Sequence, residues 1–107
     1  MRREKLLPLT ETAYYILLAL LEPAHGYAVM QKIEALSEGQ VRIAAGTLYG
    51  AFENLAGKRL IGPVKSDDPR RKNYETTGKG RRILMEDCRR MEHMVALTRG
   101  AMKEEKA

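Results

Sequence analysis

The stretch that most constrains the fold is residues 44–58, which the sequence pattern predicts to form a helix with one buried face. Apolar side chains recur at helical spacing, with Leu48, Phe52 and Leu55 at positions i, i+4 and i+7. At about 100° per residue, the opposite face carries glycines among larger side chains: Gly46, Thr47, Tyr49, Gly50, Glu53, Asn54 and Gly57. Because a glycine inside a helix costs roughly 1 kcal/mol relative to alanine, we infer that the missing side chains let a partner reach the backbone. On this stretch alone, a surface helix that tolerates poor helix formers is an equal alternative.

The net charge of +5 is concentrated in one part of the chain. Residues 1–57 carry five basic and six acidic side chains, residues 58–82 carry nine and three, and residues 83–107 carry five and five. The net charges of these segments are therefore −1, +6 and 0. Such a concentration directly after the glycine-faced helix favours a polyanionic partner, with a solvated charged loop as the alternative.

The composition argues against several other classes of protein. The longest apolar run, residues 13–21, is shorter than the roughly 20 residues that span a bilayer, and no secretory signal pattern opens the chain, so we expect a cytoplasmic protein that does not enter a membrane. The single Cys88, with only His25 and His93, gives no disulfide framework and no metal-ligand spacing. We interpret His25 as a turn or helix-cap residue. No nucleophile, base and orienting group are recognisable together, so we predict no catalytic site, no metal and no cofactor.

Capping residues, periodicity and turn residues predict the order of the elements. They are a helix from the N-cap Thr10 to about residue 21, a helix from residues 25–27 to about 36, a strand at 40–43, the helix at 44–58, hairpin strands at 60–65 and 71–76, and a helix at 78–104 capped by Thr77. This is a mainly α chain with a small β-hairpin: a winged helix-turn-helix domain at 1–77, with a short N-terminal arm, followed by a long C-terminal dimerisation helix at 78–107. In that arrangement the third helix enters the major groove of DNA and the hairpin lies over adjacent phosphates.

The predicted hairpin carries four cationic side chains at or near its tip: Lys65, Arg70, Arg71 and Lys72. Long cationic side chains can extend from there toward phosphates, although Asp67 and Asp68 partly offset the charge and form the turn. Tyr27, at the start of the second helix, has two equal interpretations. One is a phosphate contact through its hydroxyl or backbone N–H, and the other is packing in the core.

The last predicted helix carries a seam of mostly apolar residues with a seven-residue repeat: Leu84, Cys88, Met91, Val95, Thr98 and Met102. A projecting helix cannot bury such a seam alone, so we predict homodimerisation through Leu84, Cys88, Met91, Val95 and Met102. Cys88 then serves as a small apolar filler. The first helix, which is apolar on two faces, supports the same interpretation, and folding of the last helix back onto its own domain is the alternative.

Four groups of residues resemble the motifs of PadR-type transcriptional regulators. They are Thr10-Glu11-Thr12 with the apolar run 14–21, His25-Gly26-Tyr27, Gly46-Thr47-Leu48-Tyr49, and Arg71-Lys72-x-Tyr74-x-x-Thr77-x-x-Gly80. The resemblance implies a bacterial-type homodimeric DNA-binding regulator, most often a repressor, that dimerises through its C-terminal helix. It assigns residues 46–49 to the recognition helix and residues 71–74 to the wing. Members of the family that bind flat aromatic drugs resemble one another in using a tryptophan at the dimer interface, and this chain has none.

The sequence thus predicts a sequence-specific DNA-binding transcriptional regulator, a homodimeric repressor on a two-fold related double-stranded operator. We expect the recognition helix to use Gly46, Thr47, Tyr49, Gly50 and Asn54. The class of any small-molecule effector stays open. The alternative function is a winged-helix adaptor that binds another protein without reading DNA.

Overall fold

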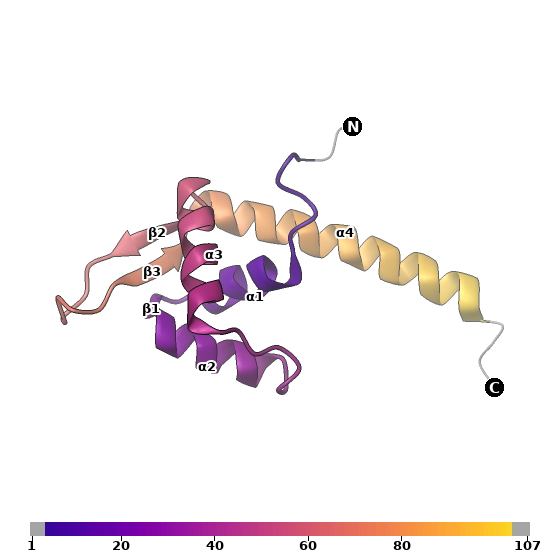
Figure 1. Cartoon of the computed structure of the whole chain (residues 1–107). Coiled ribbons are helices and arrows are strands. Elements are labelled where there is room, and N and C mark those ends of the chain that lie inside the picture. Colours follow the sequence, from indigo (N-terminus) through magenta and orange to yellow (C-terminus); the bar gives the residue numbers. More distant parts are fainter. Residues whose placement is uncertain (1–3, 104–107) are drawn as a thin grey trace.

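The computed structural model describes residues 4–103 and contains four helices and a small sheet. The elements are α1 (Glu11–Ala19), β1 (Ala24–His25), α2 (Gly26–Leu36), α3 (Ala45–Gly57), β2 (Ile61–Val64), β3 (Asn73–Thr76) and α4 (Gly78–Met102). The three shorter helices and the sheet form the body of the domain, and α4 crosses that body and projects well beyond it (Figure 1). This is the winged helix-turn-helix arrangement with a long C-terminal helix that the sequence predicted. Arg2 and Arg3 of the predicted arm lie outside the described residues.

Three of the helices begin at the capping residues that the sequence indicated. The Thr10 hydroxyl accepts a hydrogen bond from the Ala13 N–H at 3.0 Å, and the Thr77 hydroxyl accepts one from the Gly80 N–H at 3.0 Å. His25 caps α2 through its ring, because Nδ1 accepts from the Ala28 N–H at 3.4 Å. Each cap satisfies a backbone donor that the first turn of a helix leaves unpaired.

The sheet is antiparallel, and its strands lie in the order β1-β3-β2. The predicted hairpin is confirmed, with Ile61 opposite Thr76 and Val64 opposite Asn73, but its strands are shorter than expected and its loop spans residues 65–72. We refer to β2, this loop and β3 as the wing.

The predicted strand at 40–43 is wrong, since these residues form a loop and the third strand is Ala24–His25. The backbone of Val41 forms hydrogen bonds with a side chain and not with another strand. Its N–H donates to the Ser37 hydroxyl at 2.9 Å, and its carbonyl accepts from the same hydroxyl at 3.3 Å. Val41 and Ile43 still pack on the core. The alternating apolar pattern of residues 40–43 therefore reflects burial of these side chains and not pairing of the segment with another strand.

The core lies between the three short helices, β2 and the first turns of α4. It is made by fourteen buried apolar residues: Ile16, Leu17, Ala19, Leu20, Val29, Ile33, Ile43, Leu48, Phe52, Leu55, Leu60, Ile61, Ile83 and Leu84. The domain itself therefore covers much of both apolar faces of α1. Leu36, at the last turn of α2, is 47% exposed.

The end of α1 is fixed by donors from other elements, which take up the carbonyl groups that a helix C-terminus leaves unpaired. The Thr76 hydroxyl donates to the Leu17 carbonyl at 2.8 Å, and the Thr76 N–H donates to the Leu20 carbonyl at 2.8 Å. The Arg81 guanidinium donates to the Leu21 carbonyl at 2.8 Å. These contacts hold β3 and α4 against α1 and thereby fix the base of the wing.

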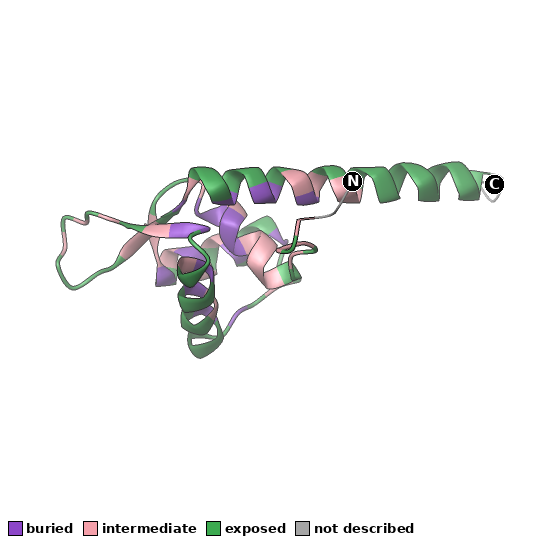
Figure 2. Cartoon of the chain, turned by 90° about the horizontal axis from the view of Figure 1, so that it is seen from above, coloured by how far each residue is buried: buried purple, intermediate pink, exposed green. Residues whose placement is uncertain are grey.

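The α4 helix has two parts with different surroundings (Figure 2). Its first turns bury Ile83, Leu84 and Asp87 against the domain, and the Asp87 carboxylate accepts from the Leu9 N–H at 3.3 Å and pairs with Arg90 at 2.6 Å. From residue 92 onward every described residue is exposed. No helix among residues 4–103 combines the length and apolar character needed to cross a membrane.

Candidate nucleic-acid interface

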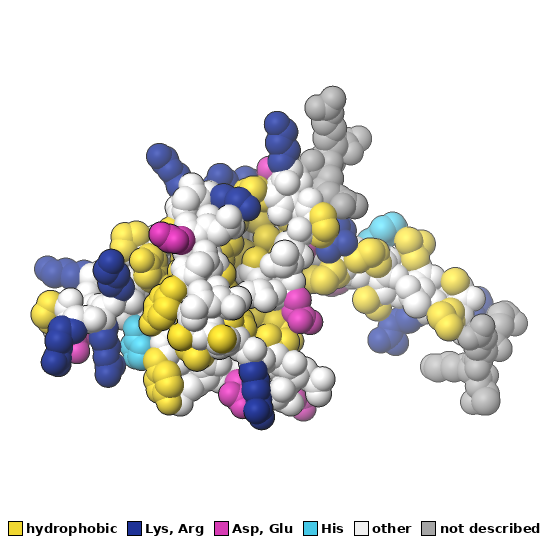
Figure 3. Space-filling model, viewed as in Figure 1, with side chains coloured by type: hydrophobic (Ala, Val, Ile, Leu, Met, Phe, Trp, Pro, Cys, Tyr) yellow, Lys and Arg dark blue, Asp and Glu magenta, His cyan; other side chains and the backbone are white. Residues whose placement is uncertain are grey.

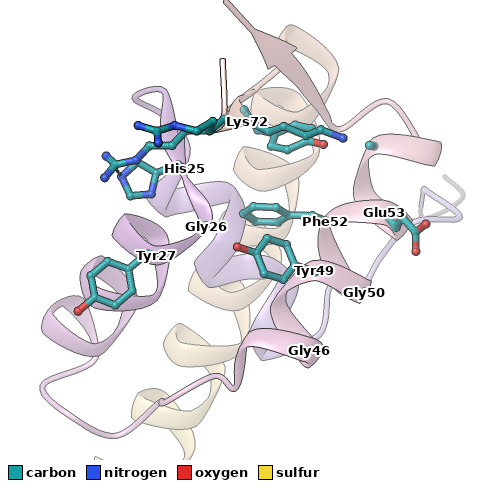
Figure 4. Close-up of a pocket in the computed structure, with 13 residues that line it drawn as sticks. His25, Gly26, Tyr27, Gly46, Tyr49, Gly50, Phe52, Glu53 and Lys72 are labelled. Atoms are coloured by element: carbon teal, nitrogen blue, oxygen red, sulfur yellow. Dashed lines mark hydrogen bonds between the residues drawn. The ribbon is translucent and has the colours of Figure 1, made fainter. Parts of the chain in front are cut away.

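A cleft of about 1010 Å³ lies between the start of α2, the outer face of α3 and the wing (Figure 4). Its lining is His25, Gly26 and Tyr27 from the β1–α2 junction, Gly46, Tyr49, Gly50, Phe52, Glu53 and Ala56 from α3, and Arg70, Arg71, Lys72 and Tyr74 from the wing. The fold therefore brings together three segments that the sequence had marked separately. One wall carries glycines and aromatic rings, and the other carries cationic side chains.

Gly46 and Gly50 leave the α3 wall of this cleft open. A Cβ atom built at either position meets no atom within 4 Å, and neither residue has a positive φ angle. The fold therefore does not require glycine at these two positions, and the missing side chains expose the helix backbone to whatever enters the cleft.

Tyr49 has a structural contact that the sequence analysis missed. A Cβ atom at Gly26 would lie only 2.8 Å from the Tyr49 hydroxyl oxygen, so the ring rests directly on the start of α2. The same ring meets Phe52 edge to face, with centroids 6.2 Å apart, and Phe52 in turn packs on Tyr74 of the wing at 5.3 Å. Tyr49 is still 57% exposed. It can both set the spacing of α2 and α3 and offer its edge to a partner.

Thr47 and Asn54, the other two predicted readers, do not line the cleft. Both are exposed on α3. Asn54 borders a separate hollow of about 120 Å³ beside Pro8 and Lys58. Their roles as base contacts stay predictions, whereas Gly46, Tyr49 and Gly50 share one wall.

In the loop of the wing, Asp68 contacts two arginines, Arg70 and Arg71. The Asp68 carboxylate accepts from the Arg70 N–H at 2.9 Å and from the Arg70 Nε at 3.3 Å, and it lies 3.8 Å from the Arg71 Nε. The Arg70 backbone bond, followed by the Arg70 side-chain bond, lowers the pKa of Asp68 below its ordinary value. Asp68 thus organises the loop in addition to offsetting its charge.

Arg71 also faces the helical wall of the cleft, with its Nη1 atom 3.3 Å from His25 Nε2. Sequence reasoning missed this link, because 46 residues separate the two side chains along the chain. Lys65 and Lys72 make no hydrogen bond or ion pair within residues 4–103. The cationic side chains gather over the wing in Figure 3.

Three other cations of the basic segment hold the frame together. Lys79 donates to the Lys58 carbonyl at 3.1 Å, Arg81 holds the end of α1, and Arg82 pairs with Glu4 and Glu86. Of the nine cations in residues 58–82, three therefore hold the frame and four lie in the wing.

Tyr27 stands at the rim of the cleft with 63% of its surface exposed. Its hydroxyl accepts from the Gln31 side-chain amide at 3.3 Å. This placement removes the core-packing interpretation and leaves the phosphate contact as a prediction.

A second hollow of about 520 Å³ lies where α1 and the end of α2 meet α4. Its apolar lining includes Tyr14, Tyr15, Leu18, Leu36 and Met91. Burial raises the pKa of Tyr14 to about 12, with further contributions from a hydrogen bond to Cys88 and from the charges of Asp87 and Glu92.

The predicted dimerisation residues fall on both parts of α4. Leu84 is buried in its own domain, Cys88 and Met91 are half-buried, and Val95 and Met102 are exposed. Thus Leu84 is already covered within one chain, while the later part of the seam lies open. Among residues 4–103 no three His, Cys, Asp or Glu side chains gather in a way that could hold a metal ion.

Comparison with known proteins supports the fold described above. The model of the transcriptional regulator PadR-like family matches residues 16–86. A PadR family transcriptional regulator from Eggerthella lenta is 29% identical, with a TM-score of 0.66 over 88% of this chain and 82% of that one. A transcriptional regulator from Clostridium thermocellum shares the fold at 24% identity, with a TM-score of 0.72 over 83% and 87% of the two chains.

A curated relative, an uncharacterised 37.1 kDa protein in a transposon of Streptomyces fradiae, is 35% identical over 69 residues. These residues are 64% of this chain but only 19% of that relative's length. The family match extends from α1 through the wing into α4, so it includes both walls of the cleft. This chain is therefore a member of the PadR-like family of transcriptional regulators.

Proposed function

We propose that this protein is a homodimeric, sequence-specific DNA-binding repressor that acts in the cytoplasm on a two-fold related operator. The observation that carries the proposal is the cleft in which the glycine-bearing wall of α3 faces the cationic wing. Base edges are read in the major groove, whereas phosphates are held by cations and by N–H groups. We expect the α3 wall of the cleft to contact base edges and the wing to contact phosphates.

On DNA, we expect α3 to lie in the major groove with Gly46 and Gly50 against it, so that the helix backbone approaches closely. Tyr49, Thr47 and Asn54 are the proposed base contacts. The wing places Arg70, Arg71, Lys65 and Lys72 over the neighbouring phosphates, and Tyr27 binds a phosphate on the other side of the cleft. Glu53 lines the same wall, where a carboxylate accepts from a cytosine amino group.

The dimer is supported by the apolar surface that one chain leaves uncovered. Val95 is 49% exposed, and Met94, Leu97 and Met102 are exposed on the same helix beyond the domain. The 520 Å³ hollow between α1 and α4 continues this surface toward the body. We propose that the partner's α4 packs along Met91, Val95 and Met102. The hollow is also large enough for part of a small-molecule effector, whose chemical class its residues do not specify.

The test is selection of genomic fragments that bind the protein, followed by titration of a selected duplex at several salt concentrations. A specific site with two-fold symmetry and a steep loss of affinity with salt supports the proposal, because released counterions set that slope. Failure to select any fragment, or binding with a flat salt response, contradicts it and favours the adaptor function. In that case the cleft would bind a protein segment, and capture of a peptide ligand would follow.

A further inference from the structure

Gly26, the first residue of α2, lies against the ring of Tyr49 from α3. Gly26 is buried and, apart from the neighbouring backbone of α2, the three atoms nearest to a Cβ atom built there all belong to that ring. They are the hydroxyl oxygen at 2.8 Å, Cε1 at 3.0 Å and Cζ at 3.1 Å. Figure 4 shows the hydroxyl pointing toward Gly26. Glycine therefore permits a close approach here and does not serve a positive φ angle.

Phe52 holds the same ring from a second direction. The two rings meet edge to face with centroids 6.2 Å apart, and Phe52 is only 3% exposed, so the packed core leaves it no room to move aside. Phe52 also packs on Tyr74 of the wing, with centroids 5.3 Å apart. One row of contacts thus joins the start of α2, α3 and the wing, the three segments that line the cleft.

Tyr49 is held in this way although 57% of its surface is exposed. An exposed side chain ordinarily samples several rotamers, and binding that must first order it loses affinity. The loss is about two- to tenfold for each side chain that a complex immobilises. A ring that the free protein already holds in place avoids this loss.

We propose that Gly26 is a positioning residue for DNA recognition: it acts through Tyr49, whose ring Gly26 and Phe52 hold in one orientation toward the major groove. This inference rests on the proposed DNA-binding function and adds a residue that has no side chain with which to read DNA. The missing side chain at Gly26 thus differs in purpose from those at Gly46 and Gly50, where a Cβ atom meets nothing within 4 Å.

Gly26→Ala tests this arrangement because it adds only the missing Cβ atom. At 2.8 Å that atom would overlap the Tyr49 hydroxyl, since non-bonded atoms attract best at about 3.5 Å or more. The ring is the part that can shift, because it ends a flexible side chain and more than half of Tyr49 is exposed. It then moves into the cleft that is proposed to receive DNA. Alanine is a better helix former than glycine, so α2 itself is not weakened.

The experiment measures the Kd of a selected duplex and of an unrelated duplex, at a salt concentration at which the Tyr49→Phe protein still prefers the selected one. The variants are Gly26→Ala, Tyr49→Phe and the two together, because Tyr49→Phe removes the atom nearest to the added Cβ. The matched control is Gly57→Ala, the same change at a position on α3 that has no neighbour within 4 Å and lies outside the cleft. Calorimetry gives the Tm of each protein.

Gly26→Ala should lower the affinity for the selected duplex by about two- to tenfold per protomer. It should leave the affinity for the unrelated duplex unchanged, because the cations of the wing are untouched, and its Tm should not fall. In the Tyr49→Phe background the same change should cost clearly less. Gly57→Ala should bind both duplexes as the parent does. Nuclear Overhauser contacts between the Gly26 Hα protons and the Tyr49 ring should be present in the free parent protein.

Three binding results overturn the inference while DNA binding itself stands: parental affinity of Gly26→Ala, an equal loss in the Tyr49 and Tyr49→Phe backgrounds, or an equal loss for both duplexes. Failure of Gly26→Ala to fold also overturns it, because Gly26 would then be a packing residue of the domain. Absence of the Overhauser contacts in the parent has the same meaning. Absence of any preference of the parent for a selected duplex instead contradicts the proposed function.

Discussion

Replacement of Gly50 by leucine separates the stability of α3 from its approach to DNA. Gly50 lies in the middle of the helix, on the wall of the cleft, and a Cβ atom there meets nothing within 4 Å. Leucine is a better helix former than glycine by up to roughly 1 kcal/mol, and its Cβ atom would have open space around it. For a domain of this size, that gain raises the Tm by up to about 4–8 °C.

The effect of Gly50→Leu on DNA binding should be the opposite. If the helix backbone lies in the groove, the leucine side chain occupies space that the base edges need, and specific contacts cannot form. We expect affinity for a selected duplex to fall toward the non-specific level, a loss of about a thousandfold or more. Calorimetry gives the Tm, and fluorescence anisotropy with specific and unrelated duplexes gives the two affinities.

Gly57→Leu is the matched control, since it is exposed on the same helix, has no neighbour within 4 Å of a built Cβ atom and lies outside the cleft. It should bind DNA as the parent does. Parental binding by Gly50→Leu would place the α3 wall outside the groove. Loss of folding by Gly50→Leu would mean that the packing around this glycine differs from the open surface described above.

Three further changes test other parts of the molecule. The double change of Arg71→Ala and Lys72→Ala should weaken binding to all duplexes. It should also lower the steepness of log K against log salt by about 0.9 per lost phosphate contact. An unchanged slope would show that neither side chain contacts DNA. Met91→Glu with Val95→Glu should dissociate the dimer by placing like charges in the seam; sedimentation that shows a wild-type monomer at micromolar concentration, or a mutant dimer as tight as the parent, contradicts the interface. Because burial raises the pKa of Tyr14 to about 12, the folded chain holds this proton more tightly than the unfolded chain; the resulting stability is complete below about pH 10 and is lost as the pH rises through about 12. Denaturant titrations across that window should show a steeper decline for wild type than for Tyr14→Phe, and equal declines would contradict the assignment.

Features set by local residues were predictable from the sequence. The caps at Thr10, His25 and Thr77 and the periodicity of the four helices depend on neighbours within one or two turns. The hairpin was also predictable in outline, because its two strands are close in sequence. The resemblance to known motifs added the prediction that residues 46–49 belong to a recognition helix and residues 71–74 to a wing.

Features set by distant residues were not predictable. Strand β1 has only two residues and exists because β3, almost 50 residues later, lies beside it. The loop at 40–43 has a strand-like pattern, but no neighbouring strand is placed to pair with it. The contacts of Tyr49 with Gly26 and of His25 with Arg71 likewise appear only once α2, α3 and the wing have docked.

The last helix shows why a repeat in the sequence does not by itself define an interface. Leu84 and Val95 lie on the same seam with a seven-residue repeat, yet the domain buries the first and leaves the second exposed. Helical periodicity specifies which face is apolar, and the length of the domain decides how much of that face is covered. The residues available to a partner are therefore those from about Met91 onward.

The number of phosphate contacts is limited by the basic residues that the domain already uses for its own contacts. Nine basic residues lie between positions 58 and 82, but Lys79, Arg81 and Arg82 hold carbonyls and carboxylates of the frame. Releasing them for DNA would unfasten the end of α1 and the start of α4, so their charge supports the fold and not the interface. The wing holds four of the remaining six cations, which limits its own salt slope to about 3.6 per protomer, or about 7 for a dimer. A slope well above that value would require cations from outside the wing, and Lys58 and Arg59 at the end of α3 are the two that remain in this segment.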